Sequence, residues 1–252
     1  MYTVFSLLTW NIALNKVSYS APDDWDADTN LVEMLQLIEE KDPDVLCLQE
    51  MPKPNFGLRF VDYHPIPAIE SHSGYTSVFL KKSKFEIIEY GQFSGGVLAK
   101  IKSKDGDFYI SSIHLFPFKD NDQPRLQQLA QILLYVAQHE NLPLIISGDS
   151  NMREAETKKV LSLDLKDAFF EAKSPKEHKF SWNSKMNIHS EGGFPFSARF
   201  DRIFIRDFNV LKFELTANTP VSENSTHFLS DHFALYVELD ISKSSGNLDE
   251  FF

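Results

Sequence analysis

The sequence has little of what would place the chain outside a cell or in a membrane. It holds one cysteine, Cys47, which cannot form an internal disulfide and lies in an apolar run where a buried thiol is expected. The N-terminal segment lacks the basic stretch and small-residue cleavage site of a secretory signal, and no apolar run approaches the ~20 residues that span a bilayer. We therefore expect a soluble, monomeric, intracellular protein without a membrane partner, nuclear in a eukaryote and cytoplasmic otherwise.

Positive charge is also scarce. The chain has 25 Lys and Arg residues against 36 Asp and Glu residues, which gives a formal net charge of −11 at pH 7. Proteins that bind duplex nucleic acid non-specifically usually carry a basic surface, because neutralised phosphates supply much of their affinity. The composition therefore argues against broad duplex binding, but it is compatible with an enzyme that holds a few phosphates through a bound cation.

Neither internal repeats nor a linker divide the chain before about residue 242. Its 252 residues fit one large α/β domain, with hydrophobic and charged residues at 42% and 24%, as in ordinary globular proteins. We expect one catalytic domain over residues 1–241. The tail over residues 242–252 is rich in Ser, Gly, Asn and acidic residues, which is typical of disorder.

Strand and helix patterns alternate along this domain. Helices are expected over residues 29–41, with Asp28 or Thr29 as the N-cap, then from Asp122 onwards, and after Asn151. Apolar runs bounded by turn residues predict strands over residues 4–10, 44–49, 74–82, 95–102, 108–115, 142–149, 199–205 and 233–241.

The order of these elements indicates the architecture. The first helix lies between the first two strands, which predicts a β-α-β unit, and the strands between residues 74 and 115 suggest an antiparallel run. Residues 172–198 are expected to form a long loop. Two β-sheets packed together and covered by helices on both outer faces are the natural arrangement for this α/β pattern.

Polar residues that could carry chemistry stand at the ends of the expected strands. Side chains in such places can converge on one rim of a sheet sandwich while the strands hold them rigidly. Each residue alone has an ordinary explanation, because Asn and Asp after a strand are usually turn residues and a lone His is more often structural. The case for a site depends on the whole set: Asn11, Glu50, His114, Asp149, Asn151, Asp201, Asp231 and His232.

The short motifs around these residues resemble those of the endonuclease/exonuclease/phosphatase superfamily. They occur in that family's order and at compatible spacing: TWN at 9–11, LQE at 48–50, SSIHL at 111–115, GDSN at 148–151, FDRIF at 200–204 and SDH at 230–232. The resemblance implies a four-layer α/β sandwich, with two packed mixed β-sheets flanked by helices and a site at one end of the sheets. It also implies a metal-dependent phosphodiesterase.

The chemistry of phosphodiester hydrolysis asks for these residue types. It needs a cation on the non-bridging oxygens, an activated in-line water and stabilisation of the developing charge. Glu50 offers the hard oxygen ligand that Mg²⁺ prefers, with Mn²⁺ as the alternative ion. Asp231 and Asn11 are expected to help hold the metal, directly or through waters.

The remaining motif residues have roles that the resemblance implies. Asp149 is expected to act as the general base or to orient the water, and Asn151 to fix the position of that water. His232, held in one tautomer by Asp201, would donate to a phosphate oxygen as charge builds there. His114 would support the same phosphate from the other side.

Longer stretches resemble the 5′-tyrosyl-DNA phosphodiesterases within this superfamily. They are GYTSVFLKKS at 74–83, RLQQ at 125–128, GDSNMRE at 148–154, FSWNSKMN at 180–187 and RFDRIFIR at 199–206. Enzymes of that family release a tyrosine, left by a trapped topoisomerase, from a DNA 5′ end. The resemblance implies protein-linked DNA 5′ ends as the substrate and substrate contacts from Arg125, Arg153 and Trp182. For Trp182, an anchor in the core or in a loop is an equally open alternative.

Two departures from that family bear on the substrate. The segment HLFP at 114–117 lacks a serine that the family has near the phosphate, and the segment after TWNI reads Ala-Leu-Asn instead of Asp-Gly-Leu. An N-terminal ubiquitin-binding module, as in the animal enzymes, is not expected either. These differences affect the expected substrate preference more than metal-dependent hydrolysis.

The tail carries a separate signal. Ser245, Leu248, Phe251 and Phe252 resemble the sliding-clamp peptide pattern Gln-x-x-Leu-x-x-Phe-Phe, with Ser in place of Gln. One helical turn would place the three apolar side chains on a common face for a hydrophobic groove. The alternative is that the two aromatic rings dock on the protein's own surface.

The sequence thus leaves several functions open. The leading prediction is a DNA-repair hydrolase of 5′-phosphotyrosyl bonds, and the first alternative is a nuclease or apurinic-site endonuclease of the same superfamily. A phosphoinositide or sphingolipid hydrolase would normally have membrane-binding apolar loops or a transmembrane anchor, and the sequence shows neither. A non-catalytic scaffold that recruits partners through its tail is disfavoured because the motif residues are intact.

Overall fold

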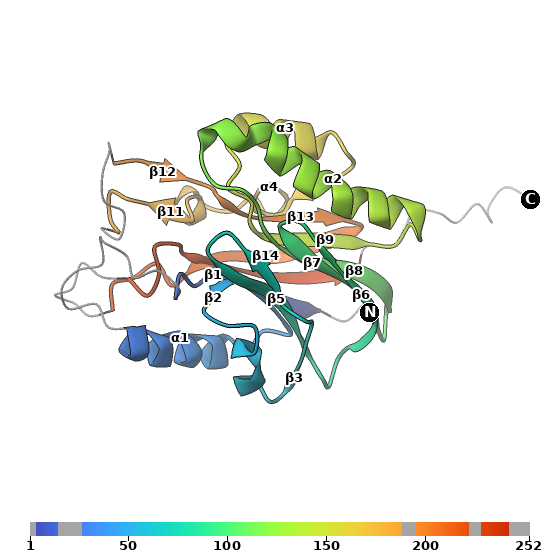
Figure 1. Ribbon diagram of the computed structural model, residues 1–252, viewed down its shortest axis with the longest axis horizontal. Coiled ribbons are helices and arrows are strands. Elements are labelled where there is room, and N and C mark those ends of the chain that lie inside the picture. Colours follow the sequence, from blue (N-terminus) through green and yellow to red (C-terminus); the bar gives the residue numbers. More distant parts are fainter. Residues whose placement is uncertain (1–3, 15–26, 188–194, 222–227, 242–252) are drawn as a thin grey trace, which may run out of the picture.

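The computed structural model describes residues 4–14, 27–187, 195–221 and 228–241. It consists of two β-sheets packed face to face, with α1 against the outer face of one and α2 and α3 against the outer face of the other (Figure 1). This is the expected four-layer α/β sandwich. Within the described residues, no helix is long and apolar enough to cross a membrane. Residues 242–252 lie outside the described ranges, so the boundary between domain and tail stays a prediction.

The first sheet has the strand order β14-β15-β1-β2-β5-β3, with β4 paired to β5. In it β1 and β2 are parallel and are joined by helix α1, which confirms the predicted β-α-β unit, and the other pairs are antiparallel. The bounds are β1 Phe5–Asn11, α1 Ala27–Lys41, β2 Val45–Met51, β3 Tyr63–Pro65, β4 Ile69–Ser71, β5 Gly74–Lys81, β14 Phe208–Thr216 and β15 Ala234–Ile241.

The second sheet has the order β10-β13-β9-β8-β7-β6. Here β8 and β9 are parallel and α2 connects them. The bounds are β6 Glu86–Phe93, β7 Gly96–Ser103, β8 Gly106–His114, α2 Asp122–Gln138, β9 Leu144–Asp149, α3 Glu154–Leu161, β10 Lys166–Asp167, α4 Ala168–Glu171 and β13 Asp201–Arg206. A small separate ribbon pairs β11 (Trp182–Asn183) with β12 (Ser197–Ala198), and short 3-10 turns cover Phe56–Arg59, Lys119–Asn121 and Lys176–His178.

Side-chain alternation along the strands divides the interior into layers. On β1, Leu7 packs into the core between the sheets, whereas Leu8 packs with Met34 of α1 on the outer side. On the other sheet, Leu129 of α2 packs over the outer face. Cys47 lies in the core between the sheets, as expected, and burial raises the pKa of its thiol to about 12.

Several expectations about elements are wrong. The strand at residues 74–82 lies in the first sheet, so it does not form one antiparallel run with β7 and β8. Strands β6 and β14 are not predicted, because neither has a continuous apolar run: exposed and half-buried positions alternate along β6, and polar residues interrupt the buried positions of β14. The supposed loop at 172–198 contains a 3-10 turn and β11, and α1 begins at Ala27, ahead of both proposed caps.

Strand directions bring the motif residues to one end of the sandwich. The parallel pairs β1 and β2, and β8 and β9, end at the same rim, and β13 and β15 begin there because they run antiparallel to β9 and β1. In register, Asp149 lies opposite His114 on one side and Asp201 on the other. The two sheets therefore present their polar strand ends to each other.

Candidate active site

Asn11 links the two sheets at this rim. Its side-chain Nδ2 donates to Glu50 Oε1 at 3.0 Å and to Asp149 Oδ2 at 3.1 Å, and all three side chains are buried. Its Oδ1 accepts from the backbone N–H of Ala13 at 3.1 Å, which fixes the orientation of the amide. One amide thus holds two carboxylates from different sheets close to each other.

His232 forms the second part of the cluster. Its Nδ1 lies 2.7 Å from Asp201 Oδ2 and its Nε2 lies 3.7 Å from Asp149 Oδ2. The loop that carries it is tied down, because Trp10 Nε1 donates to the His232 carbonyl at 3.0 Å and the Ser230 hydroxyl accepts from the His232 N–H at 3.1 Å. The Asp201 contact fixes which nitrogen of His232 faces the other carboxylate.

His114 closes the cluster from β8. Its Nε2 lies 3.6 Å from Glu50 Oε1 and 3.7 Å from Asp149 Oδ2, and its Nδ1 lies 3.0 Å from the hydroxyl of Ser71. The ring of His72 stands 4.1 Å from the His114 ring, centroid to centroid. The sequence does not predict Ser71 and His72 as site residues, because they lie at the end of β4 and in the turn that follows it, and only the tertiary fold brings them to the rim.

The backbone is strained where it carries the cluster. Glu50 lies within β2, not after it, with φ 55° at the irregularity between Leu48 and Met51, and Asn151 has φ 52°. The turn glycine Gly74 packs so closely on this bulge that a Cβ there would meet the Glu50 Cα at 2.9 Å. Left-handed backbone at non-glycine residues is uncommon and often accompanies functional sites.

Burial and crowding of carboxylates shift two pKa values in the cluster. Burial raises the pKa of Asp149 to about 7; Asp201 adds to the rise and His232 opposes it. Burial alone would lower the pKa of His232, but the carboxylates of Asp201, Asp149 and Asp231 together raise it to about 10. The cluster therefore has an excess of acid that the histidines only partly offset.

The donor set fits a hard divalent cation. Single ligand atoms of Asp149, Asp201 and His232 all lie within 4.8 Å of one another, so these residues could hold a metal ion. Among the described residues, the buried Asp201 Oδ1 accepts no hydrogen bond. Carboxylate and amide oxygens are the ligands that Mg²⁺ and Mn²⁺ prefer, and a buried excess of carboxylates is favourable only when a cation compensates it. The three residues Asp149, Asp201 and His232 differ from the metal ligands predicted from the sequence, which are Glu50, Asn11 and Asp231.

Asp231 and Asn151 flank the cluster. Asp231 is buried next to His232 and its Oδ1 lies 3.4 Å from the Ser230 hydroxyl. The Asn151 backbone N–H donates to Asp149 Oδ1 at 2.9 Å, and the Asn151 side-chain Nδ2 donates to the Leu115 carbonyl at 3.0 Å. Asn151 therefore orients Asp149 through its backbone. The roles given to both residues stay predictions.

Two of the three predicted substrate residues lie beside the cluster. The Trp182 ring stands 4.9 Å from the His232 ring and 5.9 Å from Phe200, and both contacts are edge-to-face. The Arg153 guanidinium lies 5.3 Å from the Phe200 ring centroid and donates to the Asn151 carbonyl at 2.9 Å. Trp182 and Arg153 are both partly exposed, and their role in substrate binding stays a prediction.

Arg125, the third, is fully buried. Its Nε and Nη2 donate to the two carboxylate oxygens of Glu156 at 2.8 and 2.9 Å, and its Nη1 donates to the carbonyls of Phe116 and Phe118. This geometry gives Arg125 a structural role between α2, α3 and the segment after β8, and it does not favour direct contact with a substrate. The predicted tail residues Ser245, Leu248, Phe251 and Phe252 lie outside the described residues.

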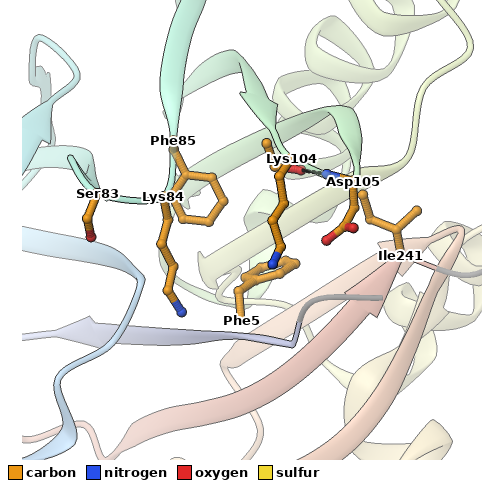
Figure 2. A pocket seen from close by; sticks show the side chains of 8 residues that line it. Phe5, Ser83, Lys84, Phe85, Lys104, Asp105 and Ile241 are labelled. Carbon is orange, nitrogen blue, oxygen red and sulfur yellow. Dashed lines mark hydrogen bonds between the residues drawn. The ribbon is translucent and has the colours of Figure 1, made fainter. Parts of the chain in front are cut away.

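A pocket of about 300 Å³ lies at the opposite end of the sandwich, where β1 begins and β15 ends. Figure 2 shows the side chains of Lys84 and Lys104 beside the apolar side chains of Phe5, Phe85 and Ile241 in the lining of this pocket. Among the described residues, its lining includes the carboxylate of Asp105 but no histidine. This part of the lining therefore has no cluster of carboxylates and histidine like the one at the other end of the sandwich.

The amino-acid sequence is similar to those of known proteins. The sequence model of the Endonuclease/Exonuclease/phosphatase family matches residues 8–232. Tyrosyl-DNA phosphodiesterase 2 of Xenopus tropicalis is 28% identical over 220 residues, which cover 80% of this chain and 56% of the relative. The 5′-tyrosyl-DNA phosphodiesterase of Caenorhabditis elegans is 23% identical over 254 residues, covering 91% of this chain and 65% of the relative. The chain thus spans less than two thirds of the length of these relatives.

Solved structures show the same fold. The crystal structure of D. rerio TDP2 complexed with single strand DNA product has a TM-score of 0.79 at 21% identity and covers 94% of this chain and 99% of that chain. The human Nocturnin catalytic domain with bound sulfate anion has a TM-score of 0.70 at 19% identity, covering 95% and 94%. At these identities the likeness concerns the fold alone.

Proposed function

The chain belongs to the endonuclease/exonuclease/phosphatase family, and we propose that it is a metal-dependent phosphodiesterase that releases tyrosine from the 5′ end of a DNA strand. The observation that carries the proposal is the buried cluster in which Asn11 joins Glu50 and Asp149 across the two sheets. The named relatives and the DNA-bound structure of one of them support DNA as the substrate.

In this proposal Glu50 would hold Mg²⁺ or Mn²⁺, and Asn11 and Asp231 would help to hold it, directly or through waters. We prefer Glu50 to Asp201 and His232, because Asp201 Oδ2 and His232 Nδ1 are already engaged with each other at 2.7 Å. When bound, the ion would supply Lewis-acid stabilisation of the phosphate oxygens.

The chain's own residues would handle the protons and the orientation of the substrate. Asp149, with a pKa raised to about 7 by burial, is suited to accept a proton from the attacking water, and the Asn151 backbone N–H holds its other oxygen. The imidazolium of His232, oriented by Asp201, would donate to a phosphate oxygen as negative charge builds. His114 would contact the same phosphate from the β8 side, and Trp182 and Arg153 would hold the strand.

The experiment that tests this function compares three DNA substrates in Mg²⁺: a 5′-tyrosyl oligonucleotide, an abasic duplex and an unmodified strand. We expect EDTA-sensitive release of tyrosine that disappears in Glu50→Ala. Cleavage of only the abasic or unmodified DNA would favour the nuclease alternative and overturn the proposed substrate. If none of the three is hydrolysed, the lipid phosphate or scaffold alternatives take its place.

The tail supports a separate proposal, that Leu248, Phe251 and Phe252 bind a sliding clamp with Ser245 in place of the usual Gln. The sequence pattern alone supports it. Titration of a labelled peptide of residues 242–252 with a purified clamp tests it, with a Phe251→Ala, Phe252→Ala peptide as the control. Equal binding of the two peptides would contradict the proposal.

A further inference from the structure

A pocket of about 250 Å³ lies next to the candidate active site and is rich in guanidinium groups. We call it the arginine pocket. Its lining includes Arg153, Glu154, Lys179, Arg199, Phe200 and Arg202. None of the motif residues of the carboxylate cluster lines it, so it is a separate cavity.

Two arginines of the pocket are buried with unused donors. The side chain of Arg202 is fully buried, and its Nη1 lies 3.1 Å from Asp167 Oδ2, whereas its Nε and Nη2 have no hydrogen-bond partner among the described residues. The side chain of Arg199 is 3% exposed; its Nη2 donates to both oxygens of Asp167 at 2.7 and 2.6 Å, and its Nη1 lacks such a partner. Buried polar groups are nearly always hydrogen-bonded in folded proteins. These donors therefore point to a further acceptor in the pocket.

Among the described residues of the lining Glu154 is the acidic one, but it does not complete these bonds. Its Oε1 lies 3.5 Å from Arg202 Nη2 and 3.7 Å from Arg199 Nη1, and its side chain is 53% exposed. Arg153 and Lys179 add positive charge at the pocket wall. Among the described residues, the four cations Arg153, Lys179, Arg199 and Arg202 outnumber the carboxylates of Glu154 and Asp167, in a chain whose net charge is −11.

We propose that the arginine pocket binds a phosphate group through Arg199 Nη1 and the free donors of Arg202, with Lys179 supplying further positive charge. Guanidinium groups present donors in a planar fork that matches phosphate oxygens, and such charge-assisted bonds are stronger than neutral ones. Glu154 occupies the same side of the two guanidinium groups and competes with the incoming anion.

The position of the pocket identifies the phosphate that it would take. The Trp182 ring contacts His232 on one side and Phe200 on the other, and Phe200 lines the pocket. A strand whose scissile phosphate lies at His232 would therefore pass Trp182 and bring another phosphate of the same strand to the pocket. This assignment to the substrate strand rests on the proposed function, whereas the binding of phosphate does not.

Calorimetric titration of inorganic phosphate into the full chain, in EDTA, tests the pocket without hydrolysis. Removing the competing charge in Glu154→Gln should tighten phosphate binding about fivefold, and Lys179→Ala should weaken it by a similar factor. Arg202→Lys keeps the charge but loses the fork and should also weaken binding. Lys158→Ala, on the exposed side of α3 outside the pocket lining, is the matched control and should bind like the wild type.

An unchanged affinity in both Glu154→Gln and Lys179→Ala would overturn the pocket as a phosphate site. Both side chains are accessible to solvent, so these variants should fold even if Arg202→Lys does not. Tighter binding after loss of an acidic side chain is a result that a merely structural role would not give.

The second arm identifies the source of the phosphate. 5′-Tyrosyl oligonucleotides are lengthened one nucleotide at a time, and KM is expected to fall at one added phosphate in the wild type but not in Lys179→Ala, with kcat unchanged. Phosphate binding without this step in KM would assign the pocket to a free phosphate instead of the strand. Hydrolysis without phosphate binding would overturn the pocket and leave the proposed function intact, and phosphate binding without hydrolysis would do the reverse.

Discussion

Two buried clusters of charged side chains differ in how their charges are balanced. In the candidate active site, Glu50 and Asp149 share the amide of Asn11, and the nearest basic nitrogens to Asp149 Oδ2 belong to His114 and His232, each at 3.7 Å. Between α2 and α3, Arg125 instead meets Glu156 through two parallel bonds of 2.8 and 2.9 Å. One cluster has an excess of acid, and the other is neutral.

The Arg125–Glu156 pair supports the structure, whereas the carboxylate cluster has the features of a functional site. The Arg125–Glu156 pair needs no further partner, because Arg125 Nη1 also donates to two backbone carbonyls and Glu156 Oε1 also accepts from the Arg153 N–H. It fixes the start of α3 and the segment after β8, which follow Asp149 and His114. The carboxylate cluster is unfavourable until a cation joins it, which is the expected property of a metal-dependent site.

The largest effect is expected on activity from a change that barely alters size. Asp149→Asn removes the proton acceptor and one carboxylate, and it should lower kcat about 10³- to 10⁴-fold. The isolated protein should not lose stability, because the variant also removes a buried charge from an acid-rich cluster. Single-turnover kinetics and a thermal melt of the same preparation check both points, and a Tm well below that of the wild type would contradict the second.

At the Arg125–Glu156 pair we expect the opposite result, a large loss of stability with little change in kcat. Glu156→Ala leaves the Arg125 guanidinium buried without its carboxylate and should cost about 3 to 5 kcal/mol of unfolding free energy. The kcat of the molecules that remain folded should stay within about threefold of the wild type, because Glu156 has no contact with the carboxylate cluster. Urea unfolding and activity below the transition measure the two effects. A large loss of kcat with normal stability would contradict the structural role of the Arg125–Glu156 pair.

A smaller effect is expected in the pH dependence of stability without metal. The pKa of Asp149 is raised from 3.8 to about 7, so the folded state keeps its proton while the unfolded chain ionises, and stability falls as pH rises from about 4 to 7. The pKa of His232 is raised from 6.5 to about 10, so its contribution is full below pH 6.5 and is lost towards pH 10.

Both groups thus make the metal-free protein less stable at higher pH. Urea unfolding in EDTA at pH 5, 7 and 8.5 measures the slope. Asp149→Asn should remove the decline between about pH 4 and 7, whereas Glu156→Ala should keep it at a lower overall stability. A wild-type protein that gains stability from pH 5 to 7 in EDTA would argue against the excess of acid.

The sequence predicts the fold and the main cluster because both follow from local signals. Buried strands read as apolar runs, and Asn11, His114 and Asp149 end such runs, so one rim was the natural place for them. Strand partners are less predictable, since the same period of two fits either sheet. For this reason the pattern predicts the wrong neighbours for β5 and does not reveal the partly exposed strands β6 and β14.

Contacts that depend on tertiary structure cannot be predicted from this sequence alone. Ser71 reaches His114 only because β4 folds back along β5, and nothing in the spacing of the two residues indicates this contact. Arg199 and Arg202 stand in a motif predicted from resemblance, but their unused donors depend on where Asp167 and Glu154 lie. The motif around Arg125 predicts that the residue matters but does not predict its surroundings. Only the structure shows that Arg125 is buried against Glu156 and therefore has a structural role.

The most direct test of the account is calorimetric binding of Mg²⁺ to the wild type, Glu50→Gln and Glu156→Ala, each at a temperature where it is folded. We predict a specific site in the wild type and in Glu156→Ala, and its loss or strong weakening in Glu50→Gln, because Glu50 belongs to the carboxylate cluster, whereas Glu156 is already paired with Arg125. Mg²⁺ binding that is the same in Glu50→Gln as in the wild type, or that is lost in Glu156→Ala, would contradict it.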